Sequence, residues 1–208
     1  MPLKHPITGR QRQNAEIRKP EIVRSFYETV LEQGLEGASI AKVAARIQIH
    51  PSLILHYFGN KESLTLALVD YVVDEYTRLF ENVRLKGLGP EARLEKLLDT
   101  VWSRRYYEKI HIASSFAMIA VSFRNPAIHE KIQGLYLNFR QFLIREIRAA
   151  RQAGVIQTHD PEGAANRIVT LIEGARHFRH FFIPETDVNA YNRDMKTVTR
   201  AIVEMKQP

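Results

Sequence analysis

Apolar residues recur at steps of three and four along most of this chain, the spacing that gathers them on one face of an α-helix. Residues 20–33 place Ile22, Phe26 and Val30 on such a stripe, and Gly34 marks its end. The same spacing predicts longer helices over about 61–85, 91–108, 125–153, 161–182 and 187–206. The stretch 111–122 is nearly all apolar or small, so its helix should be buried on most sides. Because the sequence shows no strand pattern, the chain is predicted to be all-α.

The stretch from residue 39 to residue 61 differs from the rest, because its helices are short and its breaks lie close together. Ser39 is a favourable N-cap for a helix over about 40–47, and Pro51 suits the first turn of a helix over about 51–57. Ile49 lies in the turn between them, and Gly59 ends the second helix. This is the layout of a helix-turn-helix, whose second helix enters the major groove of DNA. The alternative is a plain pair of packed helices in an α-helical protein.

If the stretch is a helix-turn-helix, Ile54 and Phe58 bury the back of the second helix and leave its other residues outside. The N-terminal end of such a helix points at base edges, and helix N-termini favour phosphates. Apolar side chains there suit thymine methyls, whereas polar ones suit bases or the backbone. We therefore expect DNA contacts from Ser39, Lys42, His50, Pro51, Ser52, Leu53, Leu55, His56, Tyr57 and Lys61.

Charge supports a polyanionic partner without proving one. The 208 residues carry a formal net charge of +7, and the first 20 hold five basic side chains against one glutamate. Such a balance favours nucleic acid, although a solvated basic surface explains it equally well. Residues 1–19 are expected to form a flexible arm, which either enters a minor groove or stays in solvent.

Several functional classes find no support in the sequence. No apolar run approaches the roughly 20 residues that span a bilayer, and no secretory signal opens the chain, so no membrane partner is expected. The absence of cysteine excludes disulfides and thiolate metal sites and fits the cytoplasm. His177 and His180 lack a third ligand nearby, so neither a metal nor another cofactor is predicted. No nucleophile elbow, P-loop, zinc-protease or dinucleotide motif indicates an enzyme.

The run HYFGNKESL, which follows the predicted helix-turn-helix, resembles the TetR-type bacterial repressors over about residues 20–70. A looser resemblance covers Gly154-Val155-Ile156, Asp160-Pro161-Glu162 and 171–174. The resemblance implies about nine helices, an N-terminal DNA-binding domain and a C-terminal domain that dimerises and holds a small ligand. We accordingly divide the chain into an arm over 1–19, a helix-turn-helix domain over 20–66 and a regulatory domain over 67–208.

Three positions depart from the pattern of that family. Gln48 stands in the turn where glycine is common, and His50 stands where a serine cap is common. Both are expected to lower local stability. Leu55 replaces a tyrosine that touches phosphate, so it is expected to face a thymine methyl or a sugar instead.

Residues 91–182 are rich in aromatic side chains and histidine, which the resemblance places around a ligand cavity. An apolar cavity with a few polar groups is the usual form of such a site. The predicted lining is Trp102, Arg105, Tyr106, His111, Phe116, Phe123, Tyr136 and Phe139. The alternative is that these side chains belong to the core.

In the family that this chain resembles, the last two helices of each subunit form a four-helix bundle with those of the partner. Small residues there permit close helix approach, and aromatic or branched ones supply apolar area. The predicted interface residues are Ala165, Gly174, Phe178, Phe182, Val198 and Ile202. Two recognition helices about 34–36 Å apart can read a palindrome across successive major grooves.

The sequence therefore favours a ligand-responsive repressor that binds a palindromic operator in double-stranded DNA as a homodimer and is released by a small-molecule effector. One alternative is a helical DNA-binding protein without a ligand, with an architectural or division-linked role. The other is an α-helical enzyme, against which the missing motifs argue.

Overall fold

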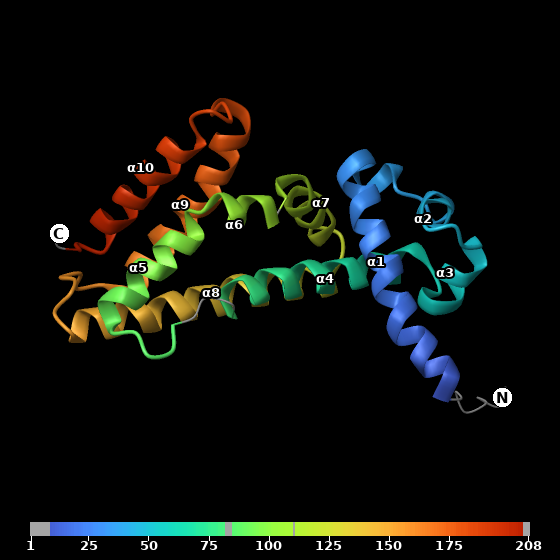
Figure 1. Cartoon of the computed structure of the whole chain (residues 1–208), viewed down its shortest axis with the longest axis horizontal. Helices are drawn as coiled ribbons and strands as arrows, with labels where there is room; N and C mark the ends of the chain where they lie inside the picture. The colour runs from blue at the N-terminus through green and yellow to red at the C-terminus, as the bar shows by residue number, and fades with distance from the viewer. Residues whose placement is uncertain (1–8, 82–84, 110, 206–208) are drawn as a thin grey trace.

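The computed structural model describes residues 9–81, 85–109 and 111–205 and contains ten α-helices within them (Figure 1). The helices are α1 (Gly9–Gly37), α2 (Ile40–Arg46), α3 (Pro51–Phe58), α4 (Lys61–Glu81), α5 (Pro90–Val101), α6 (Arg104–Lys109), α7 (Ile112–Ser122), α8 (Pro126–Gln152), α9 (Pro161–Phe182) and α10 (Val188–Ile202). One isolated antiparallel bridge, between Ile156 and Met205, is the only β pairing in these described ranges. The prediction of an all-α fold is confirmed.

The tenth helix arises because the segment predicted as one helix over 91–108 is divided. α5 ends at Val101, and the side-chain oxygen of Ser103 accepts a hydrogen bond from the Tyr106 N–H at 3.1 Å. Ser103 therefore caps a new helix, α6, instead of continuing the old one. This change of direction brings Tyr106 into the core, where only 2% of its surface is exposed.

The first helix begins at Gly9 rather than near residue 20, and it contains Pro20. Residues 9–19, which we expected in a flexible arm, are therefore helical, while residues 1–8 of that arm lie outside the described part. The predicted stop at Gly34 is visible as a kink, because Gly34 adopts a φ of 70° inside the helix. The backbone at that position favours glycine, which has no Cβ to clash.

Helix α4 connects the two halves of the molecule. Figure 1 shows α1, α2 and α3 grouped at one end of α4, and the C-terminal helices gathered along the rest of it. α4 packs against α1 on one side and against α8 on another, and α8 in turn contacts α5, α7 and α9. α4 is therefore in contact both with the α1–α3 group and with the C-terminal helices. No helix in the described ranges is long and apolar enough to cross a membrane.

Candidate functional site

The α1–α3 group holds α3 by its back and leaves its other side free. Ile54 is fully buried, and Val43 and Ala44 of α2 are buried beneath it. Ser39 caps α2, since its side-chain oxygen accepts from the Lys42 N–H at 3.2 Å. On α3, Ser52 and His56 are exposed and lie on the side opposite Ile54. The structure thus presents an exposed helix face on a rigidly packed support.

The remaining residues predicted to contact DNA from α3 surround this face. His50 and Leu55 are exposed, the latter to 45%, whereas Pro51, Leu53 and Tyr57 are half-buried. The His56 and Tyr57 rings contact each other edge to face at 5.3 Å. Apolar Leu55 is therefore exposed, and its contact with a thymine methyl or a sugar stays a prediction.

The two lysines predicted to contact phosphate are turned toward α1. Lys42 Nζ donates to Gln33 Oε1 at 2.5 Å and to the Gly37 carbonyl at 2.9 Å. Lys61 Nζ donates to the Leu35 carbonyl at 2.8 Å. These bonds tie α2 and α4 to the C-terminal end of α1. Each ammonium group has three N–H donors, so a phosphate contact from either lysine would be made beside its bonds to α1.

His50 takes over the capping role that serine has in the family. Its Nδ1 accepts from the Ser52 N–H at 3.3 Å and lies 2.7 Å from Ser52 Oγ. The cap of α3 is therefore present, and the expected loss of stability at His50 has no structural basis. The same geometry fixes the Ser52 hydroxyl at the N-terminus of α3.

Gln48, in contrast, shows the strain that its position predicts. Its φ is 54°, a left-handed conformation that glycine adopts freely and other residues adopt at a cost. The turn needs this conformation, because the Ile49 N–H returns to the Ala44 carbonyl at 3.0 Å. The left-handed conformation of Gln48 is therefore part of the turn that sets the angle between α2 and α3.

Replacing Gln48 with glycine is expected to raise the free energy of unfolding by about 0.5–1 kcal/mol, since relief of the left-handed strain exceeds the added entropy of the unfolded chain. Chemical denaturation of the variant and the parent measures the change. Gln48→Ala is the matched control, because it removes the same side chain but keeps the strain. An equal gain in the alanine variant would contradict this account.

Helix α4 and the C-terminal helices form a half-open cavity of about 320 Å³, within the usual size range of small-molecule sites. It is lined from α4, α6, α8 and α9 by Val73, Tyr76, Thr77, Phe80, Tyr106, Leu135, Tyr136, Asn138, Phe139, Phe142, Arg145 and Glu173. Phe80 is central among the rings, with its centroid 4.6 Å from that of Phe139 and 6.1 Å from that of Tyr106. Half of the lining residues are thus aromatic.

A buried arginine at one wall of the cavity connects three helices, namely its own helix α9, α4 and α7. Arg176 of α9, which is 3% exposed, donates to the Tyr76 hydroxyl of α4 at 2.8 Å and to Ser115 Oγ of α7 at 3.0 Å. Its distance to Glu173 Oε2 is 3.5 Å. Burial by itself lowers the pKa of Arg176, but Tyr76 and Glu173 outweigh it, so the pKa is raised and the group stays charged.

The cavity tyrosines remain neutral hydroxyls at ordinary pH. Burial is the main cause that raises the pKa of Tyr76, Tyr106 and Tyr136 above the usual value. For Tyr136 the nearby charge of Glu173 adds to the effect. These groups therefore present hydrogen-bonding hydroxyls and uncharged rings to the cavity.

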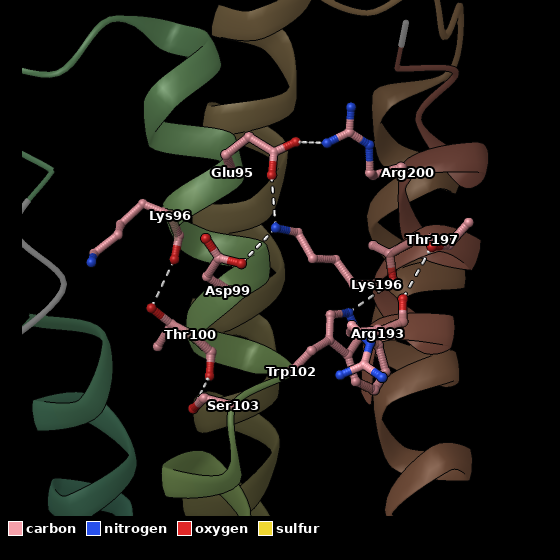
Figure 2. A network of polar contacts seen from close by, with 11 residues as sticks. Glu95, Lys96, Asp99, Thr100, Trp102, Ser103, Arg193, Lys196, Thr197 and Arg200 are labelled. Carbon is pink, nitrogen blue, oxygen red and sulfur yellow. Dashed lines mark hydrogen bonds and ion pairs between the residues drawn. The ribbon is translucent and has the colours of Figure 1, made fainter. Parts of the chain in front are cut away.

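Three of the predicted lining residues, Tyr106, Tyr136 and Phe139, meet at this cavity. Trp102 does not reach it, which corrects our prediction. Only 4% of its surface is exposed, and its Nε1 donates to Thr199 Oγ1 at 3.0 Å. Its polar tip is therefore used in the contact between α5 and α10, where Figure 2 shows it beside the α10 side chains.

The other predicted lining residues lie elsewhere, so they do not form one site with Tyr106. Arg105 and His111 border a separate hollow of about 380 Å³ between α1, α4 and α6. Phe116 packs on the His177 ring with a centroid distance of 4.6 Å. Phe123 is 82% exposed at the end of α7.

Sequence reasoning missed Tyr76, Phe80 and Glu173. The signal was present on α4, because Val72, Tyr76 and Phe80 follow one another at steps of four on one face. We predicted that helix over 61–85 but assigned none of its residues to the cavity. Glu173 lies in the 171–174 stretch of the looser resemblance, but we did not assign it to the lining, because a single carboxylate on a helix is ordinarily a solvated residue.

The predicted dimer residues divide into two groups. Gly174 and Val198 are exposed, Phe178 and Phe182 expose 50% and 68% of their surface, and Ile202 is half-buried. Ala165 is a correction, because it is 0% exposed and packs inside its own subunit.

The opposite face of α10 is held on α5 by ion pairs, which fixes which side points outward (Figure 2). Lys196 Nζ lies 2.8 Å from Glu95 Oε2 and 2.5 Å from Asp99 Oδ1, and Arg200 pairs with Glu95 as well. Val198 therefore remains on the outer side, at 38% exposure.

Comparisons with known proteins agree with this arrangement. The family described as "Bacterial regulatory proteins, tetR family" matches residues 27–68, and "Tetracyclin repressor-like, C-terminal domain" matches residues 90–207. The HTH-type transcriptional regulator BetI 1 of Chromohalobacter salexigens is 25% identical over 111 residues, which are 53% of this chain and 55% of that protein. The chain thus spans about half the length of this curated relative.

Two solved structures share the fold. A TetR transcription regulator from Haloarcula marismortui has a TM-score of 0.78 at 21% identity, covering 92% of this chain and 100% of its own. A transcriptional regulator from Saccharomonospora viridis, solved in complex with choline, has a TM-score of 0.79 at 16% identity over the same shares. Because the C-terminal family match alone covers more than half of the residues, the chain belongs to the TetR family of bacterial regulatory proteins, which are not enzymes.

Proposed function

We propose that this protein is a transcriptional repressor that binds a palindromic operator as a homodimer and leaves it when a small molecule occupies the cavity. The observation that carries the proposal is the position of α4. Its first residues pack against the α1–α3 group, and Tyr76 and Phe80 near its end line the cavity. One rigid helix therefore links the exposed face of α3 to the ligand space.

The exposed face shared by α9 and α10 supports the homodimer. Along α9, Asn166, Thr170, Gly174, Phe178 and Phe182 are exposed at steps of four, and on α10 Ala190, Thr197, Val198 and Ala201 are exposed. The small residues allow helices to approach closely, while the two phenylalanines supply apolar area. A two-fold axis through this face would pair the same surface of two copies, and we propose that its direction places both α3 helices on one side of the dimer.

The cavity and the choline-bound relative support a small organic effector. An effector must bind the state that cannot dock on DNA more tightly than the state that can, because equal affinity shifts no equilibrium. Contacts with Tyr76 and Phe80 would let the effector bind the two states with different affinity, since both side chains are on α4. A change of a few ångströms in the separation of the two α3 helices would prevent both from docking at once.

The test is a gel-shift titration with the full-length protein on a palindrome taken from upstream of its own gene, beside a scrambled duplex of equal length. We expect a retarded complex on the palindrome alone, and its release by a small-molecule extract of the host cells. Equal binding to both duplexes would contradict sequence-specific recognition. Specific binding without release by the extract would favour a DNA-binding protein with no ligand.

A further inference from the structure

The lining of the cavity between α4, α6, α8 and α9 indicates which kind of molecule it accepts. We propose that it binds a small organic cation with an alkylated nitrogen, and that Glu173 selects for the positive charge. This inference rests on the proposed function, since it names the chemical class of the effector.

The walls suit a cation that carries few hydrogen-bond donors. Six of the lining side chains are aromatic, contributed by α4, α6 and α8: Tyr76, Phe80, Tyr106, Tyr136, Phe139 and Phe142. The faces of such rings carry partial negative charge and attract ammonium groups, quaternary ones included. Because burial keeps the three tyrosines protonated, the ring faces stay the attractive element.

Rings of this cavity already attract cations from the protein itself. The guanidinium carbon of Arg145 lies 5.8 Å from the centroid of the Phe142 ring, and that of Arg176 lies 6.0 Å from the Tyr76 ring. Arg145 is an exposed side chain, so solvent screens its charge from a bound molecule. A ligand cation can therefore occupy the ring faces that these arginines leave open.

Glu173 is the one acidic side chain among the described residues that line the cavity. Its side chain is 26% exposed, and its contact with Arg176 at 3.5 Å is longer than an ordinary charge-assisted hydrogen bond. Arg176 is held instead by its shorter bonds to Tyr76 and Ser115. A bound cation can thus take Glu173 as its counter-ion while Arg176 keeps those two partners.

An anionic ligand fits the same walls poorly. It would meet the carboxylate of Glu173 and the negative faces of the rings at once. Of the two arginines near these walls, Arg145 is exposed and screened by solvent, and Arg176 is already bonded to Tyr76 and Ser115. A neutral apolar molecule would bury the same area but would gain nothing from Glu173. Charge is therefore the property that distinguishes the proposed ligand from its competitors.

The experiment is calorimetric titration of the full-length protein with two cations and their neutral carbon isosteres. Choline is paired with 3,3-dimethylbutan-1-ol, and phenyltrimethylammonium is paired with tert-butylbenzene. We expect at least one cation to bind about tenfold more tightly than its isostere, a difference within the range of a desolvated cation against aromatic faces and a carboxylate.

The variant Glu173→Gln keeps the shape of the side chain and removes its charge. It should weaken binding of that cation about tenfold and leave the isostere nearly unaffected. Glu130→Gln, on an exposed site of α8 outside the lining, is the matched control and should change neither affinity.

Equal affinity for cation and isostere, or an unchanged cation affinity in Glu173→Gln, would overturn the proposal. So would release of the operator by the cell extract when no cation binds, a result that leaves the proposed function standing. Failure of every extract and probe to release the operator, in contrast, would overturn the ligand response itself.

Discussion

Replacing Phe178 with glutamate is expected to convert the protein to a monomer and to lower its operator affinity about a thousandfold, toward non-specific binding. Phe178 is half exposed, stacks at 6.2 Å on Tyr191 of α10, and stands on the outward stripe of α9. In a two-fold symmetric interface one substitution places two carboxylates in the same contact. The free-energy cost of burying these two carboxylates without partners exceeds the free energy that the remaining apolar area of the interface contributes.

Light scattering gives the oligomeric state of this variant, and the gel shift gives its affinity. Leu88→Glu is the matched control, because Leu88 is also an exposed apolar residue, at 39%, but lies in the segment before α5. The control should remain dimeric and bind the operator normally. A dimeric Phe178→Glu protein would show that the α9–α10 face is not the interface.

The helices of this fold follow from local signals that a sequence displays. Ser39, Asn125 and Asp160 cap α2, α8 and α9 as their residue types predict, and their side chains accept from backbone N–H groups two or three residues onward. Gly34 and Gly59 adopt positive φ angles, at which α1 is kinked and α3 ends. Such features depend on a few consecutive residues, so spacing and composition suffice to locate them.

The cavity depends on contacts that local signals do not encode. Arg176 meets Tyr76, 100 positions earlier, and Ser115, 61 positions earlier. Helical spacing shows that each residue lies on some face but not which faces meet. The same limit explains the errors at Trp102 and Ala165, whose side chains face a neighbouring helix of their own subunit. The short helix α6 decides the outcome at Tyr106, because the break at Ser103 turns this residue inward.

Replacing Ser52 with glutamate should lower operator affinity about a hundredfold while leaving the fold intact or slightly more stable. Ser52 is exposed in the first turn of α3, where an acidic side chain is favourable to the helix itself. The same charge would face the phosphates and base acceptors of a groove. Stability and DNA affinity are therefore expected to change in opposite directions, which separates a contact residue from a structural one.

The control is Ala92→Glu, an exposed position in the first turn of α5, which should leave operator affinity unchanged. Measuring both variants at low and high salt adds a second criterion. Because repulsion between the new carboxylate and phosphates is screened by salt, the deficit of Ser52→Glu should shrink as ionic strength rises. A deficit that is independent of salt would mean that Ser52 acts through a base contact alone. Unchanged affinity would place the DNA-binding surface away from α3.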